Sequence, residues 1–279
     1  MSCAENTLAM LRSLAALLLI LLVLGMGNLN DKLNREQTQI FDLTRFLKDS
    51  TRCAVIFGDH ESKKEEAIPT LWKTIWNQAP IRFCIDHGAN RLFHHKNEGM
   101  EPPTKIVGKL DRLDEETKKY FEGKETPMED TYSDEEPDTL STMKSLALED
   151  LENVSMVLML GGFNGRFDRM LGNLDSLVRA NALFPIPTVV LHNRNLITVL
   201  PKGDLALKMD RDLLSGAAGF VPILQEKTVV TTGGFKWNMD SEEMKFGERV
   251  STSNQMESDR LELNTTAPLV FTAEIKETE

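Results

Sequence analysis

The stretch VSMVLMLGGFNGRFD, at residues 154–168, decides the predicted fold of this chain. Its first seven residues are almost all apolar, and a turn that contains three glycines follows them. A short apolar run bounded by turn residues is typical of a strand that is buried on both faces of a sheet. Beyond the turn, Met170, Leu171, Leu174 and Leu177 recur at helical spacing, which predicts a helix over residues 166–179. A buried strand that leads through a glycine turn into a helix indicates a parallel sheet covered by helices.

The same alternation of strand and helix extends over the first half of the chain. The segment at residues 28–50 precedes these elements. Its Ile40, Leu43 and Leu47 recur at helical spacing, which predicts an amphipathic connecting helix. An α/β domain with a mainly parallel sheet and helices on both faces is then predicted over residues 53–184. Its predicted strands are residues 53–58, 81–85, 105–107 and 154–160, and its predicted helices are residues 65–76, 114–121, 139–148 and 166–179.

The pattern changes near Pro185, after which helix signals are scarce. Turn residues separate a series of short β-like runs in this part of the chain. We therefore expect residues 185–279 to form an all-β C-terminal domain, either a sandwich or a barrel. The predicted strands are residues 188–191, 196–200, 219–224, 227–231, 250–254, 260–263 and 269–272.

The bulk composition limits the classes of function that this chain can serve. With 41% hydrophobic and 27% charged residues, the chain has the composition of a globular protein. Its formal net charge of −11 argues against a broad nucleic-acid surface, which needs clustered lysine and arginine. The three cysteines, Cys3, Cys53 and Cys84, show no metal-ligand spacing and no disulfide framework.

An uncharged apolar run occupies residues 13–26, directly after Arg12. The run is short for a helix that crosses a bilayer, but it has the length of the apolar region of a signal peptide. With residues 8–11 added it also fits a membrane anchor, and a buried helix is a third interpretation. We treat residues 1–27 as an apolar leader and residues 28–52 as a linker, and we expect membrane contact only through residues 8–26.

Polar clusters follow three of the predicted strands at residues 86–91, 108–112 and 161–168. Because ligands of an open parallel sheet bind beyond the carboxyl ends of its strands, we expect these clusters to meet at one edge. In the third cluster, glycines let the backbone approach a ligand closely, and Arg166 adds hydrogen-bond donors at a helix N-terminus. This combination suits a phosphate group, although a purely structural glycine turn has the same residues.

The carboxylates Asp86 and Asp111 also stand at strand ends, where they could hold Mg²⁺ together with substrate phosphates. Each of them taken alone is typical of a helix cap or a turn. Trp237 lies in the β half between Lys236 and Asn238, and it fits either a core position or a ligand platform. The acidic loop at residues 129–138 is typical of a solvated segment.

Four ordered motifs of this chain resemble the thiamine pyrophosphokinase (thiamin diphosphokinase) family of animals. CIDHGANRL at residues 84–92 is similar to C-A-D-G-G-A-N-R-L, and GGFNGRFDRMLGNLDSL at residues 161–177 is similar to G-G-x-x-G-R-x-D-H-x-L-A-N. TTGGFKWNM at residues 231–239 and VSTSN at residues 250–254 are similar to T-T-x-G-L-K-W-N-L and V-S-T-S-N. The resemblance covers residues 53–275.

This resemblance implies an α/β domain on the ATP side, a thiamine-binding β-sandwich, and a homodimer with active sites between the subunits. The reaction it implies transfers the pyrophosphoryl group of ATP to the hydroxyl of thiamine, with Mg²⁺, to give thiamine diphosphate and AMP. The implied roles are metal binding for Asp86 and Asp111, nucleotide or phosphate binding for Asn90 and Arg91, the phosphate turn for Gly161, Gly162, Gly165, Arg166 and Asp168, and thiamine binding for Trp237, Ser253 and Asn254.

The chain departs from the family pattern at several positions of the expected metal site. The family has G-D-F-D-S where this chain has Gly108-Lys109-Leu110-Asp111-Arg112, so lysine replaces an acid and arginine replaces serine. Ser141 stands where another acid is expected, unless Asp134, Glu136 or Asp138 supplies it, and His87 replaces a glycine. A cation repels Mg²⁺, but Lys109 could instead neutralise the phosphates directly.

Two functional hypotheses follow from these motifs and departures. The first is an active thiamine pyrophosphokinase, with Asp86, Asp111, Arg166 and Lys109 as its catalytic residues. The second is a degenerate relative that binds thiamine or nucleotide with little turnover. The resemblance implies a cytoplasmic protein, whereas the leader is typical of a protein directed to the endoplasmic reticulum or anchored in a membrane.

Overall fold

Strand β2 (Cys53–Phe57) lies inside a parallel sheet, and all five of its residues are buried. The computed structural model describes residues 38–58, 62–86, 88–131 and 136–276. β2 pairs in parallel with β6 on one side and with β3 on the other. The parallel part of the sheet has the order β7-β6-β2-β3-β4-β5, formed by β7 (Thr188–His192), β6 (Met156–Leu160), β2, β3 (Ile81–Ile85), β4 (Lys105–Gly108) and β5 (Met128–Asp130).

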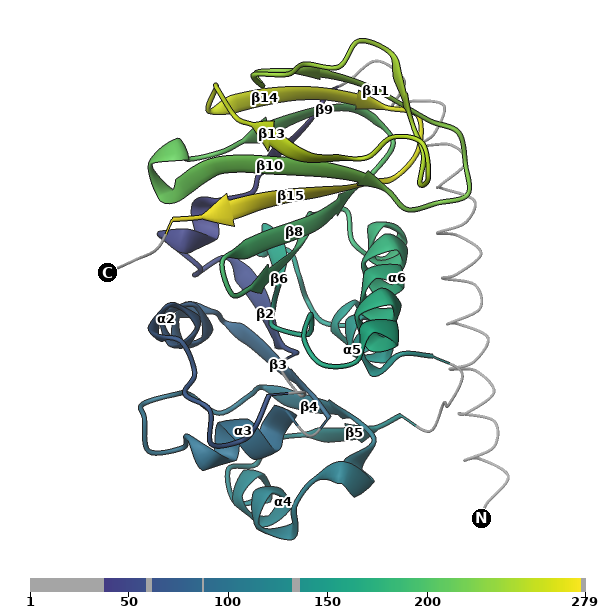
Figure 1. Ribbon diagram of the computed structural model, residues 1–279. Helices are drawn as coiled ribbons and strands as arrows, with labels where there is room; N and C mark the ends of the chain where they lie inside the picture. The colour runs from purple at the N-terminus through teal and green to yellow at the C-terminus, as the bar shows by residue number, and fades with distance from the viewer. Residues whose placement is uncertain (1–37, 59–61, 87, 132–135, 277–279) are drawn as a thin grey trace. The chain divides into compact units, whose positions relative to one another are not determined.

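Helices cover both faces of this sheet, as Figure 1 shows. Side chains alternate along β2, so Val55 and Phe57 belong to one core while Ala54 and Ile56 belong to the other. The first core includes apolar residues of α2 (Thr70–Gln78), α3 (Gly88–His94) and α4 (Glu115–Glu122). The second core includes those of α5 (Asp138–Leu146) and α6 (Phe167–Leu183).

The sheet continues into the β half without a break, because β8 turns back antiparallel beside β7. It thereby reaches ten strands and runs across residue 184, where we expected one domain to give way to the next. A separate sheet of five strands has the order β1-β9-β14-β11-β12. The added strands of the first sheet are β8 (Asn195–Leu200), β15 (Leu269–Ile275), β10 (Leu214–Pro222) and β13 (Ser251–Gln255), and those of the second are β1 (Gln39–Asp42), β9 (Gly203–Lys208), β14 (Arg260–Thr265), β11 (Thr228–Gly233) and β12 (Glu242–Met244).

The two sheets of the β half share one apolar core. The rings of Phe220 and Phe271 lie 5.4 Å apart between their centroids, and Phe235 packs edge-on against Phe220 at 5.2 Å. Leu207 and Leu261 of the five-stranded sheet belong to the same buried cluster. The predicted fold class is therefore confirmed: a mainly parallel α/β part is followed by an all-β part of antiparallel strands in a sandwich.

Two predicted helices differ from the structure. The described part of residues 28–50 forms β1 and a 3₁₀ turn at Arg45–Leu47 rather than an amphipathic helix, because its backbone pairs with β9 at a sheet edge. The helix predicted from residue 65 begins at Thr70. Pro69 explains this start, since a residue that precedes proline is biased away from the helical region.

The predicted leader at residues 1–27 lies outside the described residues. Within the described part of the chain, no helix is both long enough and apolar enough to span a bilayer. Short 3₁₀ turns at Leu110–Arg112 and Arg211–Leu213 complete the described elements.

Candidate functional site at the strand ends

The carboxyl ends of the parallel strands meet at one edge of the sheet, where the chain order reverses between β2 and β6. Gly58 donates its backbone N–H to the carbonyl of Leu160 at 2.9 Å, and Gly161 donates to Leu191 at 2.9 Å. In sheets of this kind the reversal point is where ligands bind. The structure therefore places the glycine turn at the expected binding edge.

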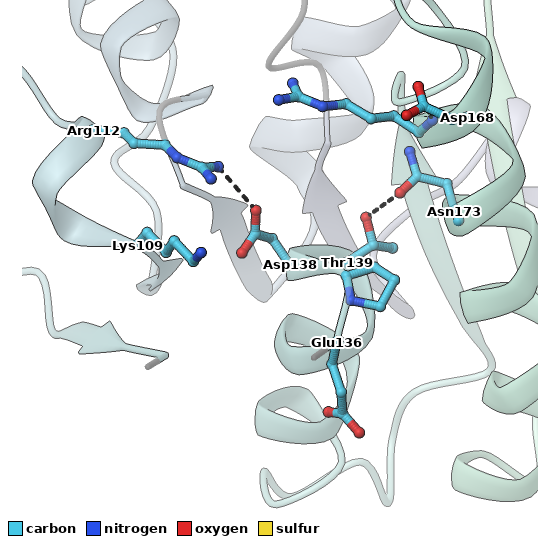
Figure 2. A pocket seen from close by; sticks show the side chains of 10 residues that line it. Lys109, Arg112, Glu136, Asp138, Thr139, Asp168 and Asn173 are labelled. Atoms are coloured by element: carbon cyan, nitrogen blue, oxygen red, sulfur yellow. Dashed lines mark hydrogen bonds and ion pairs between the residues drawn. The ribbon is translucent and has the colours of Figure 1, made fainter. Parts of the chain in front are cut away.

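A cleft of about 380 Å³ opens at this edge on the side of α5 and α6 (Figure 2). Residues from three separate segments form it. The lining residues are Lys109, Arg112, Glu136, Pro137, Asp138, Thr139, Asp168, Arg169, Gly172 and Asn173. The cleft is thus polar, with three basic and three acidic side chains among its lining residues.

The glycine turn after β6 bends sharply, and none of its three glycines lines the cleft. Gly161, Gly162 and Gly165 all have positive φ, at 83°, 85° and 78°. Asn173 of α6 donates its amide to the carbonyl of Gly162 at 2.5 Å and accepts a hydrogen bond of 2.7 Å from the hydroxyl of Thr139. Figure 2 shows the contact between Thr139 and Asn173, which ties the start of α5 to the helix after the turn.

Asp86 follows β3 and is fully buried, with a positive φ of 46°. Its backbone N–H donates to the carbonyl of Val107 at 2.8 Å. Gly108, at the end of β4, has φ 145°, and a Cβ atom there would lie 2.8–2.9 Å from the backbone N, the Cα and the Cβ of Asp86. Only glycine allows the two strand ends to approach this closely.

Arg112 joins two acidic side chains of the site. Its Nη1 atom lies 2.6 Å from Oδ2 of Asp86 and 3.1 Å from Oδ2 of Asp138. Figure 2 shows the second contact across the cleft. Burial lowers the pKa of Arg112. Its hydrogen bonds to Asp86 and Asp138 and the negative charges of these two residues have a larger, opposite effect, so they raise the pKa above its ordinary value.

Asn90 fixes the backbone of the segment that carries Arg112. Its amide donates to the carbonyl of Arg112 at 3.1 Å, and its side-chain oxygen accepts from the N–H of Asp114 at 2.9 Å. In this conformation the Asn90 side chain therefore positions a loop, and it does not line the cleft.

Arg91 faces a different part of the edge. It is 3% exposed, donates to the carbonyls of Glu66 and Ala67, and lines a second pocket that also includes Asn164 and His192. Burial lowers the pKa of His192. Arg91 belongs with residues on the side of α2 and α3, away from the lining of the cleft.

Arg166 and Asp168 form an exposed ion pair at the start of α6, 2.5 Å apart between Nη2 and Oδ2. The hydrogen bond from Arg166 lowers the pKa of Asp168. Asp168 lines the cleft, whereas Arg166 is held at its margin through this pair. Both residues are half exposed or more, so an anionic ligand can compete for Arg166.

Only some of the residues expected at the metal site line the cleft. Asp111 is exposed on its 3₁₀ turn and does not line the cleft, and Ser141 is half-buried in α5. Glu136 and Asp138 of the acidic loop do line it. His87 and Asp134 lie outside the described residues.

The three residues expected to bind thiamine gather in the β half. Asn254 is buried, donates its amide to the carbonyl of Trp237 at 2.9 Å, and accepts from the N–H of Trp237 at 3.4 Å. Trp237 is 55% exposed, with the Lys236 ammonium 4.8 Å from its ring centroid. Ser253 is exposed beside them, and none of the three lines the cleft.

Several cleft residues were missed at the sequence level, Arg169 and Asn173 among them. Arg169 and Asn173 lie beyond the glycine turn on α6, and with Gly172 they share one helix face at spacings of three and four residues. The polar residues Arg169 and Asn173 at this spacing, directly after the glycine turn, were the available signal.

The geometry defines a class of protein with an α/β part, a β-sandwich part and a polar cleft at the edge of the parallel sheet. The family model for the thiamin pyrophosphokinase catalytic domain matches residues 72–188, and the model for the vitamin B1 binding domain of the same family matches residues 206–270. The chain therefore belongs to the thiamin pyrophosphokinase family.

Individual relatives agree with this assignment. The chain is 30% identical over 233 residues to thiamin pyrophosphokinase 1 of Caenorhabditis elegans, a match that covers 82% of this chain and 92% of the relative. It is 29% identical over 230 residues to thiamine pyrophosphokinase 3 of Oryza sativa, covering 76% and 85%. Thiamin pyrophosphokinase from Candida albicans has the same fold, with a TM-score of 0.73 at 17% identity over 86% of this chain and 94% of that one.

Replacement of Gly108 tests the close approach of the two strand ends. We expect Gly108→Ala to lower the free energy of unfolding by about 1–3 kcal/mol more than Gly203→Ala does. Gly203 is the matched control, because its φ is also positive, at 120°, and a Cβ atom at that position would meet nothing within 4 Å. Urea unfolding of both variants measures the difference, and equal losses would contradict a steric requirement at Gly108.

Proposed function

We propose that this chain is a thiamine pyrophosphokinase, which transfers the pyrophosphoryl group of ATP to the hydroxyl of thiamine. The observation that carries the proposal is the polar cleft beside the glycine turn, in a chain whose two parts match the catalytic and vitamin B1 binding domains of that family. In the reaction, the hydroxyl oxygen attacks the β-phosphorus of ATP and forms a new P–O bond. The bond from the β-phosphorus to the α–β bridging oxygen breaks, AMP leaves with that oxygen, and the hydroxyl proton is lost.

We propose that the cleft holds the phosphates of ATP. Transfer of such a group depends on positioning and on stabilising negative charge. Lys109, Arg112 and Arg169 place three positive charges along the cleft, and the lining residue Asn173 holds the carbonyl of Gly162 in the glycine turn. Arg166 is available at the margin for a further phosphate oxygen.

We propose a different mode of binding for the expected magnesium ion. Among the described residues, no group of three or more His, Cys, Asp or Glu side chains is arranged to hold a metal ion. Asp86 and Asp138, the two carboxylates nearest the expected site, are bridged by Arg112. These residues do not fit a metal held by the protein alone, so we propose that magnesium reaches the cleft only as part of the ATP substrate, bound to its phosphates.

We propose that thiamine binds at Trp237, Ser253 and Asn254. The exposed indole of Trp237 offers a face on which a cationic heterocycle can stack, at a gain of about 0.5–2 kcal/mol. Asn254 holds the backbone of Trp237 through both its N–H and its carbonyl, and it thereby orients the ring.

We further propose a homodimer in which one subunit supplies the cleft and the other supplies the thiamine side. The two groups of residues do not share one pocket lining in the single chain. Large apolar side chains are exposed in the parts that such a dimer would join, namely Phe167 and Leu171 of α6 and Phe246, Val250 and Trp237 of the β half.

The proposed reaction is tested by measuring AMP release from ATP and magnesium with and without thiamine. We expect AMP release to depend on thiamine and to yield an equal amount of thiamine diphosphate, because one group transfer produces both. If thiamine binds, as measured by calorimetry, but no AMP forms at high protein concentration, the chain is a binding protein and the proposed reaction is wrong.

Lys109 tests whether the basic side chains serve the phosphates. We expect Lys109→Met to lower kcat/KM for ATP by about 10- to 100-fold, the effect of losing one charge-assisted contact, and Lys109→Asp to lower it further. Lys118→Met is the control, since Lys118 contacts Glu115 on α4 and neither residue lines the cleft, and less than about a fivefold change is expected. Faster turnover of Lys109→Asp would show that an acid belongs at this position.

The shared site is tested by mixing two defective variants after unfolding and refolding them together. Lys109→Asp damages the phosphate side and Trp237→Ala damages the thiamine side, so a hybrid dimer keeps one intact site. Activity of the mixture should then rise toward about a quarter of the wild-type value. A mixture no more active than the mean of its two parents would contradict shared sites.

A further inference from the structure

The carboxylates of the cleft are all engaged by cations of the same chain within the described residues. Glu136 contacts Lys144 at 2.6 Å, Asp138 contacts Arg112 at 3.1 Å, and Asp168 contacts Arg166 at 2.5 Å. Asp86, buried beside the cleft, contacts Arg112 at 2.6 Å. A divalent cation that enters this cleft therefore has to displace a side-chain cation from any carboxylate it binds.

Arg112 contacts two of these carboxylates, those of Asp86 and Asp138. Its Nη1 atom bridges a carboxylate at the end of β3 and another at the start of α5, as a metal ion does when it joins two acidic ligands. The Asp86 side chain is 1% exposed, and burial of a carboxylate is costly unless an opposite charge pairs with it. Arg112 supplies that charge without a metal.

The remaining hydrogen-bond donors of Arg112 are not used in its contacts with Asp86 and Asp138. Its Nε and Nη2 atoms make no hydrogen bond to the described residues, although the side chain is only 36% exposed and lines the cleft. A guanidinium presents its donors in a rigid fork that matches the oxygens of a phosphate group. The same side chain can thus join the two aspartates and bind an anion.

We propose that the Arg112 guanidinium takes the place of a protein-held divalent cation in this cleft. It neutralises Asp86 and Asp138 and presents its free donors to phosphate oxygens. The phosphate ligand rests on the proposed function, whereas the exclusion of a protein-bound metal rests on the ion pairs alone. The protein without nucleotide then has little affinity for divalent cations, and it binds polyphosphate when metal is removed.

Binding of Mn²⁺ to the full chain without nucleotide tests the exclusion. Electron paramagnetic resonance measures free Mn²⁺ during a titration, and we expect Arg112→Ser to bind at least about tenfold more tightly than the wild-type chain, because Asp86 and Asp138 lose their cation. Arg112→Lys, which keeps the charge, should stay close to wild type. Arg260→Ser is the matched control, because it removes an arginine from an exposed pair with Glu262 that lies outside the cleft lining.

Thermal unfolding of the same variants shows whether the metal replaces the guanidinium. Arg112→Ser should have a lower Tm than the wild-type chain, because the buried Asp86 loses its ion pair with Arg112, and Mn²⁺ should restore a large part of the loss. Mn²⁺ should leave the Tm of the wild-type chain and of Arg260→Ser unchanged. A variant that is destabilised but not rescued by Mn²⁺ would overturn the proposal.

Binding of inorganic tripolyphosphate in the presence of a chelator tests the anion side. The wild-type chain should bind it, and Arg112→Ser should bind at least about tenfold more weakly. The proposal is overturned if the wild-type chain without nucleotide binds Mn²⁺ as tightly as Arg112→Ser does. It is also overturned if the wild-type chain and Arg112→Ser bind tripolyphosphate with equal affinity. Absence of thiamine-dependent AMP release would refute the proposed enzyme activity and would leave these metal measurements unaffected.

Discussion

Burial of β2 on both faces is the constraint on which the rest of the structure depends. Its five residues contribute alternately to two cores, so helices must pack on each side of the sheet. The chain satisfies this requirement by adding β3, β4 and β5 on one side of β2 and then returning to place β6 on the other. That return creates the reversal point at which the glycine turn and the cleft lie.

Much of this arrangement could be predicted from the sequence. Continuous apolar runs such as residues 156–160 indicate buried strands because neither face offers a polar position, and parallel strands bring their following loops to one edge. Residues 28–50 misled us because Ile40, Leu43 and Leu47 keep helical spacing although the backbone of β1 pairs at an edge. Arg112 could not be predicted to join Asp86 to Asp138, since its partners lie 26 residues away in opposite directions along the chain.

The two groups of predicted ligand residues have different physical characters. Around the cleft, charge is balanced pair by pair, so an incoming anion meets cations that are already held in place. Near Trp237, the side chain of Asn254 forms its hydrogen bonds with the backbone of Trp237. The group that this part of the chain offers to a ligand is the aromatic face of Trp237. Several residues that a family motif marks therefore act here as supports for their neighbours.

The contact between Gly108 and Asp86 gives the cleft a mechanical property. Because Gly108 has no side chain, the ends of β3 and β4 lie close together, and Asp86 is tied to the segment of β4 by its hydrogen bond to Val107 and its ion pair with Arg112. A force that displaces the loop after β4 is consequently transmitted to β3 and to α5 through Asp138. This side of the cleft is therefore held together by contacts within the chain itself, which link β3, the segment after β4 and the start of α5.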